Sequence, residues 1–345
     1  MTATSPKDTI VTAATLDRRD RTLHDLRLSL TDHCNLRCRY CLPAEVFGPE
    51  FRFTHSERFL DVDQIVQLVT AFASLGVRKL RLTGGEPLLR KDVVGIVRRT
   101  ATIAGIEDVA LTTNGVRLPD LAMPLTEAGL KRINLSCDAI DDAVLTRLAG
   151  RKLTFSCIED AIDAARAAGL VVKLNMVVQR GFNEDQVVPL ARYCRDRGLT
   201  LRFIEYMDVG TKNRWQRADV VSGREILAML EAIGNLHPVE PAFRGEVARR
   251  YRYVGTDTEV GLINSISQPF CSNCGRARVT ATGELLTCLF ASKGLDLSPH
   301  LQPGSASKAL ESAIASRWQR RDDRYSELRQ QTVPEEKTEM WQVGG

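Results

Sequence analysis

The chain of 345 residues lacks long apolar runs and lacks a segment of the kind that directs secretion. No stretch approaches the roughly 18 consecutive apolar residues that a membrane-spanning helix needs. The first twenty residues are rich in Thr, Ala and charged side chains, without the apolar core of a signal peptide. These absences predict a protein with no membrane contact and no export signal, in which residues 1–20 form a flexible N-terminal arm.

An excess of charge of one sign is also missing. Forty-seven Lys and Arg residues against 43 Asp and Glu residues leave a net charge of +4. That excess is too small to indicate a nucleic-acid-binding surface, which requires a basic stripe. Apolar residues make up 43% and charged residues 26% of the chain, which excludes a disordered or fibrous protein. The length suits about two domains.

Cysteine, by contrast, is present in an informative pattern. Nine cysteines in a chain without an export signal indicate free thiols in the reducing cytoplasm, where disulfides are rare. Three of them are scattered, at Cys137, Cys157 and Cys194. The other six form two triplets far apart in the chain, namely Cys34, Cys38 and Cys41, and Cys271, Cys274 and Cys288. Two compact triplets predict two metal sites.

Short apolar or alternating runs recur at intervals near the ~30 residues of a strand-helix-strand unit. The predicted strands are residues 26–31, 79–83, 108–113, 132–136, 171–177 and 201–206. Helical spacing of apolar residues predicts helices at 62–75, 158–168 and 183–197. Six such strands with helices between them predict an α/β fold, a partial (β/α)6 TIM-like parallel barrel.

One face of each predicted strand is polar and often cationic. Side chains two residues apart in a strand point the same way. The aligned sets are Arg27 with Ser29 and Thr31, Lys79 with Arg81 and Thr83, Thr112 with Asn114, Asn134 with Ser136, and Lys173 with Asn175. Barrel interiors are usually filled with branched apolar side chains, and unpaired buried cations are costly. The pattern therefore predicts a lumen that holds a polyanionic ligand.

The alternation of strands and helices ends near Val209. A helix at 222–233, shorter strands near 250–254 and 260–264, and a last helix at 309–320 follow. We therefore expect a barrel domain at residues 21–217 and a smaller C-terminal α+β domain at residues 218–345. The polar tail at 330–345 is expected to be mobile.

The first triplet, with the spacing CxxxCxxC, follows the first predicted strand directly. Reactive sites of barrels lie at the carboxyl ends of their strands. Three thiolates within eight residues can bind three irons of a cubane iron-sulfur cluster and leave its fourth iron open for chemistry. The alternatives are a three-thiolate zinc site completed by His33 or water, and thiols that bind no metal.

This CxxxCxxC motif, with Tyr40 just before its third cysteine, resembles the radical S-adenosylmethionine (SAM) enzymes. In that superfamily the three cysteines bind a 4Fe-4S cluster whose open iron chelates SAM, and reductive cleavage of SAM yields a 5′-deoxyadenosyl radical. The run GGEP at residues 84–87 resembles the superfamily's motif for the methionyl amino group, although a plain turn is the alternative. The resemblance implies SAM contacts at Tyr40, Gly85, Ser136 and Met207, the last of which could also be core packing.

The second triplet begins with the CxxC pair of Cys271 and Cys274 and continues at Cys288, like half of a zinc knuckle with one further ligand. A fourth ligand is missing, because a predicted loop separates His300 from Cys288. Three thiolates again suit a cluster with one open iron, which a substrate could fill. The pair Arg276 and Arg278 can clamp a phosphate or lie on a solvated strand edge.

Both triplets together, with the run CxxCGRAR, resemble the GTP 3′,8-cyclases of molybdenum-cofactor biosynthesis, the MoaA family, over nearly the whole chain from Leu26. In that family a second 4Fe-4S cluster binds the guanine of GTP, and cationic side chains hold the triphosphate. The resemblance implies GTP contacts at Arg27, Arg81, Thr112, Lys173, Arg276 and Arg278, with Lys79 and Arg202 as further phosphate contacts. It also implies that the terminal Gly344-Gly345 reaches into the active site.

The resemblance implies a lyase that converts GTP into (8S)-3′,8-cyclo-7,8-dihydroguanosine 5′-triphosphate, the first step of molybdenum cofactor (molybdopterin) biosynthesis. The 5′-deoxyadenosyl radical removes the ribose 3′ hydrogen, and C3′ then bonds to C8 of guanine. No acid or base is needed from the protein, so no catalytic side chain is predicted; the cofactors are two 4Fe-4S clusters and SAM. The implied partners are an electron donor such as flavodoxin or ferredoxin, a downstream cyclic pyranopterin monophosphate synthase, and a second copy of the chain in a homodimer.

Two departures from the family pattern concern surface contacts. His33 and Leu42 stand where Arg and Met are more usual, and residues 317–329 lack the expected Lys-Pro and His pattern. Two other functions are compatible with the triplets: a radical SAM enzyme that modifies a peptide, and a non-catalytic zinc protein that binds nucleic acid. The cationic lumen and the Gly-Gly end disfavour the first, and the lack of a basic stripe disfavours the second.

Overall fold

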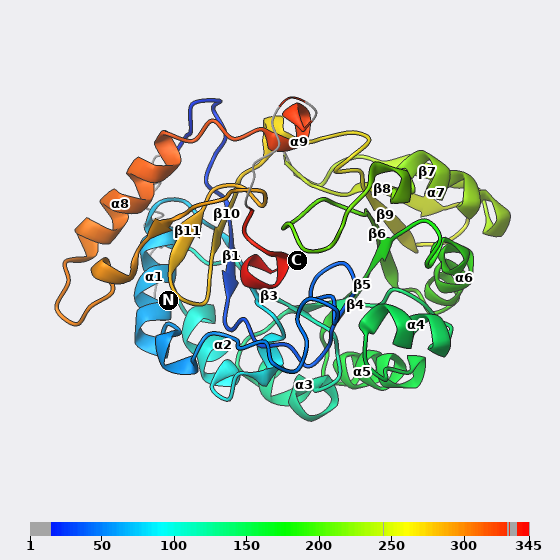
Figure 1. Ribbon diagram of the computed structural model, residues 1–345, viewed down its shortest axis with the longest axis horizontal. Helices are drawn as coiled ribbons and strands as arrows, with labels where there is room; N and C mark the ends of the chain where they lie inside the picture. The colour runs from blue at the N-terminus through cyan, green and yellow to red at the C-terminus, as the bar shows by residue number, and fades with distance from the viewer. Residues whose placement is uncertain (1–14, 244, 330, 332–336, 345) are drawn as a thin grey trace, which may run out of the picture.

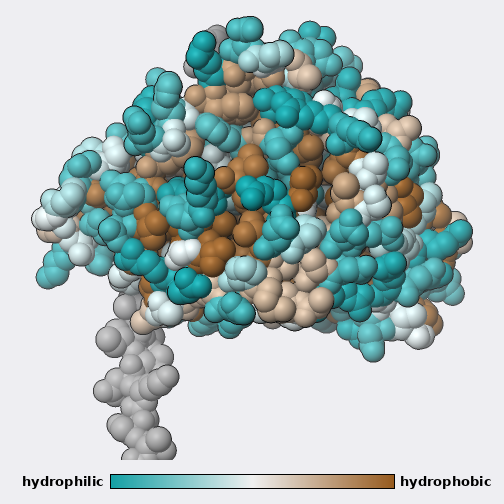
Figure 2. Space-filling model, turned by 90° about the horizontal axis from the view of Figure 1, so that it is seen from below, coloured by the Kyte–Doolittle hydropathy of each residue, from teal (hydrophilic) through white to brown (hydrophobic). Residues whose placement is uncertain are grey.

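The computed structural model describes residues 15–243, 245–329, 331 and 337–344. A single sheet of 12 strands, in the order β12-β11-β10-β1-β2-β3-β4-β5-β6-β9-β8-β7, runs through this part of the chain. Figure 1 shows the sheet curved into an open barrel with helices outside it. On the face shown in Figure 2, hydrophobic residues in the middle are surrounded by hydrophilic ones. No helix in the described ranges is long and apolar enough to cross a bilayer.

The first six strands follow one another in the sheet, and every neighbouring pair is parallel. They are β1 (Asp25–Ser29), β2 (Lys79–Thr83), β3 (Asp108–Thr113), β4 (Arg132–Ser136), β5 (Val171–Val178) and β6 (Thr200–Glu205). The bounds of β2, β3 and β4 are those expected from the sequence, and the other three differ by one or two residues at an end. The predicted parallel barrel is confirmed.

Helices connect these strands and cover the outside of the barrel (Figure 1). They are α1 (Val62–Ser74), α2 (Val93–Ala101), α3 (Leu118–Glu127), α4 (Asp142–Ala149), α5 (Phe155–Ala167), α6 (Val187–Asp196) and α7 (Gly223–Leu230). The start of α1 is a capping box, in which the Asp61 carboxylate accepts from the Gln64 backbone N–H at 2.8 Å.

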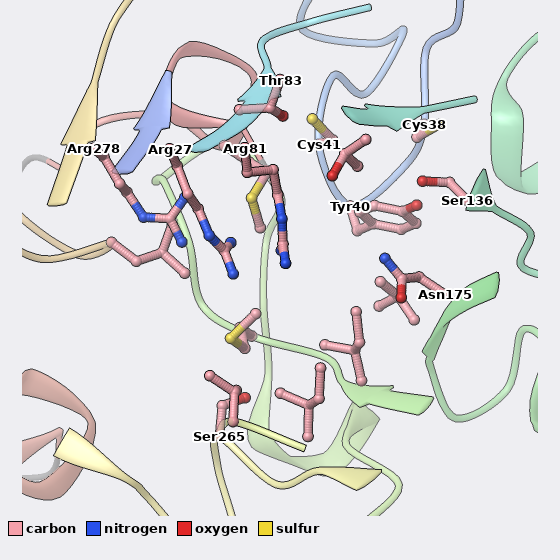
Figure 3. Close-up of a pocket in the computed structure, with 18 of the residues that line it drawn as sticks. Arg27, Cys38, Tyr40, Cys41, Arg81, Thr83, Ser136, Asn175, Ser265 and Arg278 are labelled. Atoms are coloured by element: carbon pink, nitrogen blue, oxygen red, sulfur yellow. The ribbon is translucent and has the colours of Figure 1, made fainter. Parts of the chain in front are cut away.

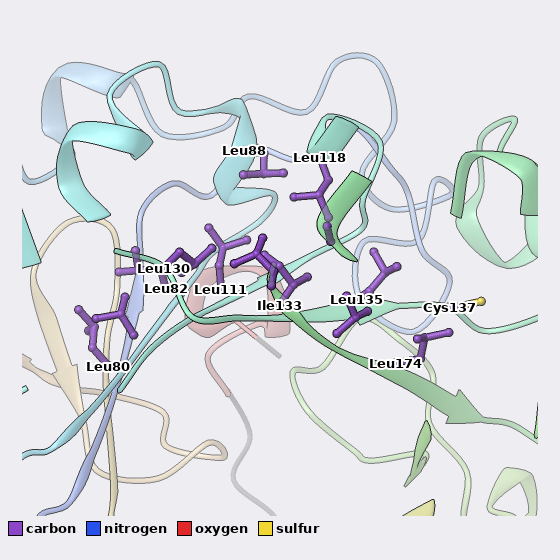
Figure 4. Close-up of a cluster of buried hydrophobic side chains, with 14 of the residues drawn as sticks. Leu80, Leu82, Leu88, Leu111, Leu118, Leu130, Ile133, Leu135, Cys137 and Leu174 are labelled. Carbon is purple, nitrogen blue, oxygen red and sulfur yellow. The ribbon is translucent and has the colours of Figure 1, made fainter. Parts of the chain in front are cut away.

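The apolar core lies between the sheet and the helices. Alternate residues of the parallel strands point outward and are buried there, among them Leu80, Leu82, Leu111, Ile133, Leu135 and Leu174 (Figure 4). Because successive strand residues face opposite sides, their neighbours in the sequence point into the lumen. The inner face is therefore free for polar side chains, as the strand pattern indicates.

The C-terminal strands add to both edges of the barrel sheet. They are β7 (Leu236–Val239), β8 (Arg249–Tyr253), β9 (Glu259–Ile263), β10 (Arg276–Val279), β11 (Glu284–Leu286) and β12 (Leu295–Asp296). Strand β9 pairs in parallel with β6, and β10 pairs in parallel with β1. Helix α8 (Ser307–Gln319) then packs beside α1. The boundary between residues 217 and 218 stays a prediction, because the sheet continues across the two expected domains.

Both ends of the chain differ from the expected loose segments. Residues 1–14 lie outside the described residues, but Asp17 is buried and accepts a hydrogen bond from Arg21 at 2.7 Å, which fixes the rest of the arm. The expectation of a polar, mobile tail is wrong for residues 337–344. Short helix α10 (Met340–Val343) buries Trp341 and Val343 in the mouth of the barrel, where Figure 1 places the C-terminus. Gly345 lies outside the described residues.

The placement of the core outside the barrel predicts the effect of two substitutions on one strand. Leu174 in β5 is 0% exposed beneath the helices, whereas Val171 in the same strand is 56% exposed. Leu174→Ala should lower the free energy of unfolding by about 2–5 kcal/mol, because it leaves a cavity in the core. Val171→Ala should change it by less than about 0.5 kcal/mol. Urea denaturation followed by circular dichroism measures both, and equal losses would contradict this placement of the core.

Candidate active site

A large cavity fills the lumen at the carboxyl ends of the barrel strands, and all six triplet cysteines line it. Within the described ranges, no three His, Cys, Asp or Glu side chains converge where a single metal ion could bind. The three thiols of each triplet can each bind a different iron of a multi-iron cluster.

The first triplet lies on the loop after β1. A tight turn brings its second and third members together, since the Cys41 backbone N–H donates to the Cys38 carbonyl at 2.9 Å. The Leu36 N–H points at the Cys34 sulfur, 3.4 Å away. Burial raises the pKa of Cys34 to about 11 and raises those of Cys38 and Cys41 well above the usual value. These residues are therefore thiols at neutral pH, and binding of a metal must displace their protons.

Tyr40 is held in the cavity by a residue that the sequence analysis did not identify. Its hydroxyl donates to the Asp138 carboxylate at 2.7 Å, and that carboxylate also accepts from the Val177 N–H at 2.9 Å. Burial raises the pKa of Asp138 to about 6. Figure 3 shows the Tyr40 ring in the cavity opposite Ser136 and Asn175. The loop of the first triplet is thereby tied to strands β4 and β5.

The glycines of the GGEP run allow close contact between β2 and the first-triplet loop. A Cβ atom on Gly84 would lie 2.3 Å from the Thr31 carbonyl oxygen, and one on Gly85 would lie 2.3 Å from that of His33. Gly84 also has a φ of +142°, which side-chain-bearing residues rarely adopt. The Gly85 N–H donates to the Thr31 carbonyl at 2.8 Å. This run is therefore more than a plain turn, because it docks the loop and lines the cavity.

Glu86 of the same run is buried beneath the cavity. Its carboxylate accepts hydrogen bonds from the Thr113 hydroxyl at 2.7 Å and from the Asn114 N–H at 2.8 Å. A third bond comes from the Leu88 N–H at 3.0 Å. Burial raises the pKa of Glu86 to about 7 in spite of these bonds. The residue joins the ends of β2 and β3, and so fixes the cavity wall.

Three arginines from adjacent strands form a row in the lumen. In the sheet register Arg27 of β1 lies between Arg81 of β2 and Arg278 of β10. Figure 3 shows the three side chains side by side, extending into the cavity. Burial and the charges of neighbouring arginines lower the pKa of Arg81 to about 10 and that of Arg278 to about 9. Such a row requires an anion to offset its charge.

The second triplet lies in the same cavity beside this row. The Arg276 guanidinium donates to the Cys274 sulfur at 3.2 Å. Burial by itself would raise the pKa of Cys274, but the charges of Arg276 and Arg321 lower it to about 6. Burial raises the pKa of Cys288 to about 12. Cys274 is therefore a thiolate at neutral pH, which favours metal binding.

The cavity brings together most of the residues expected from the sequence. Besides the cysteines, it is lined by Tyr40, Gly85, Ser136, Met207, Arg27, Arg81, Thr112, Arg202, Arg276 and Arg278. Lys79 and Lys173 do not line the cavity. Lys79 is the first residue of β2 and Lys173 the third of β5, so both lie away from the carboxyl ends of their strands. Lys79 instead lies 3.4 Å from the centre of the Phe243 ring. The roles of all these residues stay predictions.

Several lining residues were given no role by the sequence analysis: Glu86, Asp138, Asn175, Ser265, Arg321 and Met340. The strand pattern did place Asn175 in the lumen, and Glu86 belongs to the GGEP run. Asp138 follows Ser136 by two residues, at the end of β4. Arg321 and Met340 have no local signal, because only the fold of the C-terminal segment brings them to the cavity.

Two protein-family models match consecutive parts of this chain. Residues 28–194 match the model of the radical SAM superfamily, and residues 199–327 match that of Molybdenum Cofactor Synthesis C. The solved structure of Streptococcus suis SuiB bound to S-adenosylmethionine aligns with a TM-score of 0.60 and 13% identity, over 87% of this chain and 69% of that one. This likeness shows a shared fold.

Sequence relatives are considerably closer. A protein of Acidothermus cellulolyticus named GTP 3′,8-cyclase is 47% identical over 318 residues, which cover 91% of this chain and 88% of the relative. A protein of Staphylococcus aureus with the same name is 43% identical over 334 residues, which cover 95% and 98%. The chain therefore belongs to the GTP 3′,8-cyclase family of radical SAM enzymes.

Proposed function

We propose that this protein is a lyase that converts GTP into (8S)-3′,8-cyclo-7,8-dihydroguanosine 5′-triphosphate, the first step of molybdenum-cofactor biosynthesis. The observation that carries the proposal is the row of buried arginines between two cysteine triplets in one cavity. A triphosphate supplies the negative charge that such a row requires, and guanidinium groups match phosphate oxygens in geometry. Membership of the family supports the same substrate.

Cys34, Cys38 and Cys41 would hold a 4Fe-4S cluster, with SAM beside it on Tyr40, Gly85, Ser136 and Met207. The loop fits such a cluster, because its three cysteines line the cavity and supply the thiol ligands that iron-sulfur clusters take. When bound, the cluster and SAM supply a 5′-deoxyadenosyl radical, which can take the ribose 3′ hydrogen of GTP before C3′ bonds to C8. Asp138 keeps Tyr40 in place beside SAM, because its carboxylate accepts a hydrogen bond from the Tyr40 hydroxyl.

Cys271, Cys274 and Cys288 would hold a second 4Fe-4S cluster and present it to the guanine. Arg276 favours that cluster, because it donates to the Cys274 sulfur and stabilises the thiolate. Arg27, Arg81 and Arg278 would bind the triphosphate, together with Arg276, Arg202 and Thr112, which also line the cavity. Lys79 and Lys173 do not line the cavity, and we propose that their charges attract the triphosphate from a greater distance.

The chain itself orients the reactants and keeps water out. Tyr40 and Ser136 lie across the cavity from Arg27 and Arg278 in Figure 3, so a nucleotide on the arginines would present its ribose toward SAM. Met340 of α10 lines the same cavity, and Arg278 donates to the Gly344 carbonyl at 2.6 Å, so the tail covers the mouth. Enclosure of this kind protects a radical from side reactions.

The proposal includes partners of stated chemistry. A one-electron donor such as flavodoxin or ferredoxin would reduce the first cluster, and a cyclic pyranopterin monophosphate synthase would consume the product. A cytoplasmic location and a homodimer stay predictions from the sequence.

The function is tested with 3′-deuterated GTP and the anaerobically reconstituted protein in the presence of dithionite and SAM. We expect deuterium in 5′-deoxyadenosine, because the radical takes the atom from ribose C3′. Mass spectrometry of the nucleoside measures the transfer. Abundant 5′-deoxyadenosine without deuterium would contradict GTP as the hydrogen donor, and none from a fully loaded protein would contradict the radical chemistry.

Arg278→Ala should retain both clusters but lose most of the product. Removal of a charged phosphate contact costs about 1.5–3 kcal/mol, or about 10- to 150-fold in kcat/KM for GTP. Arg249→Ala, at an exposed position on β8, is the matched control and should leave turnover unchanged. Iron content, cluster absorbance and product formation are measured for both variants. Loss of cluster absorbance in Arg278→Ala would contradict a role confined to the substrate.

In the metal-free protein, Cys274 should react with iodoacetamide at lower pH than Cys34 and Cys288. Its pKa of about 6 means that its thiolate, the reactive form, forms between pH 5 and 7. The thiolates of Cys34 and Cys288, with pKa values of about 11 and 12, form only in strong base.

Peptide mass spectrometry of alkylated protein across a pH series measures this order, and the exposed Cys157 serves as the reference for reagent reactivity. Arg276→Met should move the midpoint for Cys274 to higher pH. A Cys274 midpoint above pH 8 in the unmodified sequence would contradict the proposed stabilisation of its thiolate.

A further inference from the structure

A buried ionic cluster joins the two ends of the chain behind the second triplet. The Asp17 carboxylate accepts from Arg21 Nε at 2.7 Å and from Arg321 Nη1 at 3.1 Å. The Asp17 side chain is 0% exposed, and both arginine side chains are 2% exposed. Groups buried to this degree are costly unless each is paired, and removing one partner leaves the others uncompensated. Asp17 therefore determines where both guanidinium groups lie.

Both arginines also donate to the backbone of the second triplet. Arg21 Nη1 donates to the Cys271 carbonyl at 2.8 Å, and Arg321 Nη1 donates to the Cys274 carbonyl at 2.6 Å. Arg321 Nε donates to the carbonyl of Thr287, the residue before Cys288, at 3.0 Å. Every segment that carries a cysteine of this triplet is thus bound by one of the two guanidinium groups.

The second carboxylate in the cluster strengthens the same connection. Asp323 accepts a hydrogen bond from the Thr287 hydroxyl at 2.6 Å and lies 3.5 Å from Arg321 Nε. Its backbone carbonyl accepts from Arg21 Nη1 at 2.7 Å. The segments 17–21 and 321–323 therefore enclose the second triplet from behind, and Arg321 and Asp323 also line the cavity.

We propose that Asp17, Arg21 and Arg321 are positioning residues for the second metal cluster. Asp17 orients the two guanidinium groups, which hold the three cysteine-bearing segments at the spacing that a cluster needs and set the local charge beside it. This inference rests on the proposed second cluster, and it extends that proposal to residues behind the ligands. Groups behind the ligands commonly fix ligand orientation and tune the bound metal.

A purely structural role makes different predictions. The same cluster also fastens the N-terminal segment, since the Trp318 indole donates to the Arg21 carbonyl at 3.1 Å. If that were its only task, its loss would weaken the whole fold and both metal sites alike. A positioning role instead affects iron binding at the second triplet selectively, and changes its reduction potential.

The first test compares Arg321→Met with Arg320→Met, its exposed neighbour, in two backgrounds of the full chain. In one background the first triplet is replaced by alanine, and in the other the second triplet is replaced. Iron and sulfide are measured after anaerobic reconstitution. Arg321→Met should lower iron at least threefold where only the second triplet remains, and should leave it unchanged where only the first remains.

Equal iron in Arg321→Met and Arg320→Met would overturn the proposal, as would an equal loss in both backgrounds, which signals misfolding. A chain that keeps Arg321 and only the second triplet but binds no iron would instead contradict the proposed second cluster. The two failures are therefore distinguishable.

The second test uses a substitution that keeps the size of the side chain and one of its two acceptor oxygens. Asp17→Asn removes one negative charge beside the second triplet, so the reduction potential of a cluster there should shift upward. Asp322→Asn is the control, because Asp322 pairs with Arg19 at the surface and its side chain is 55% exposed. The potential is measured by redox titration with electron paramagnetic resonance in the background without the first triplet. An unshifted potential in Asp17→Asn would overturn the electrostatic part of the proposal.

Discussion

The burial of several guanidinium groups side by side is the constraint on which the rest of this structure depends. A barrel that fills its lumen with apolar side chains can close tightly, but this one places Arg27, Arg81 and Arg278 there. Its apolar core is consequently displaced to the outer face, between strands and helices. The cost of the buried charges explains both the depressed pKa values of the lumen arginines and the need for an anionic substrate.

The topology of the sheet follows from the same requirement. Strand β10, from the C-terminal part of the chain, pairs in parallel with β1. This pairing places Arg276 and Cys274 beside the row of lumen arginines. At the opposite end β9 pairs with β6. The chain thus brings a second ligand set to the lumen by extending the existing sheet at its open edge. Two sets of cysteines more than two hundred residues apart in the sequence can face one substrate only because of this pairing.

Local patterns made the parallel strands and most of the cavity predictable, because alternation fixes which residues of a strand face the lumen. Alternation does not fix the level of a residue along the barrel axis, so Lys79 and Lys173 were grouped with the cavity residues although they do not line it. Helices α2, α3 and α4 were given no bounds, and α3 contains Pro124 within its span. The tail was misjudged because Trp341 is buried against partners distant in the sequence, among them Phe47, Phe51 and Phe53.

The tail supplies hydrogen-bond acceptors to one of the buried cations of the lumen. Arg278 donates to the carbonyls of Val343 and Gly344 at 3.0 and 2.6 Å, while Trp341 packs on the aromatic cluster beside the first triplet. Neutral carbonyls offset only part of the cost of burying a cation, so the pKa of Arg278 remains at about 9. A phosphate offers Arg278 a stronger, charge-assisted partner than these carbonyls. The same segment therefore contacts both the loop expected to hold the SAM cluster and a cation expected to bind the substrate.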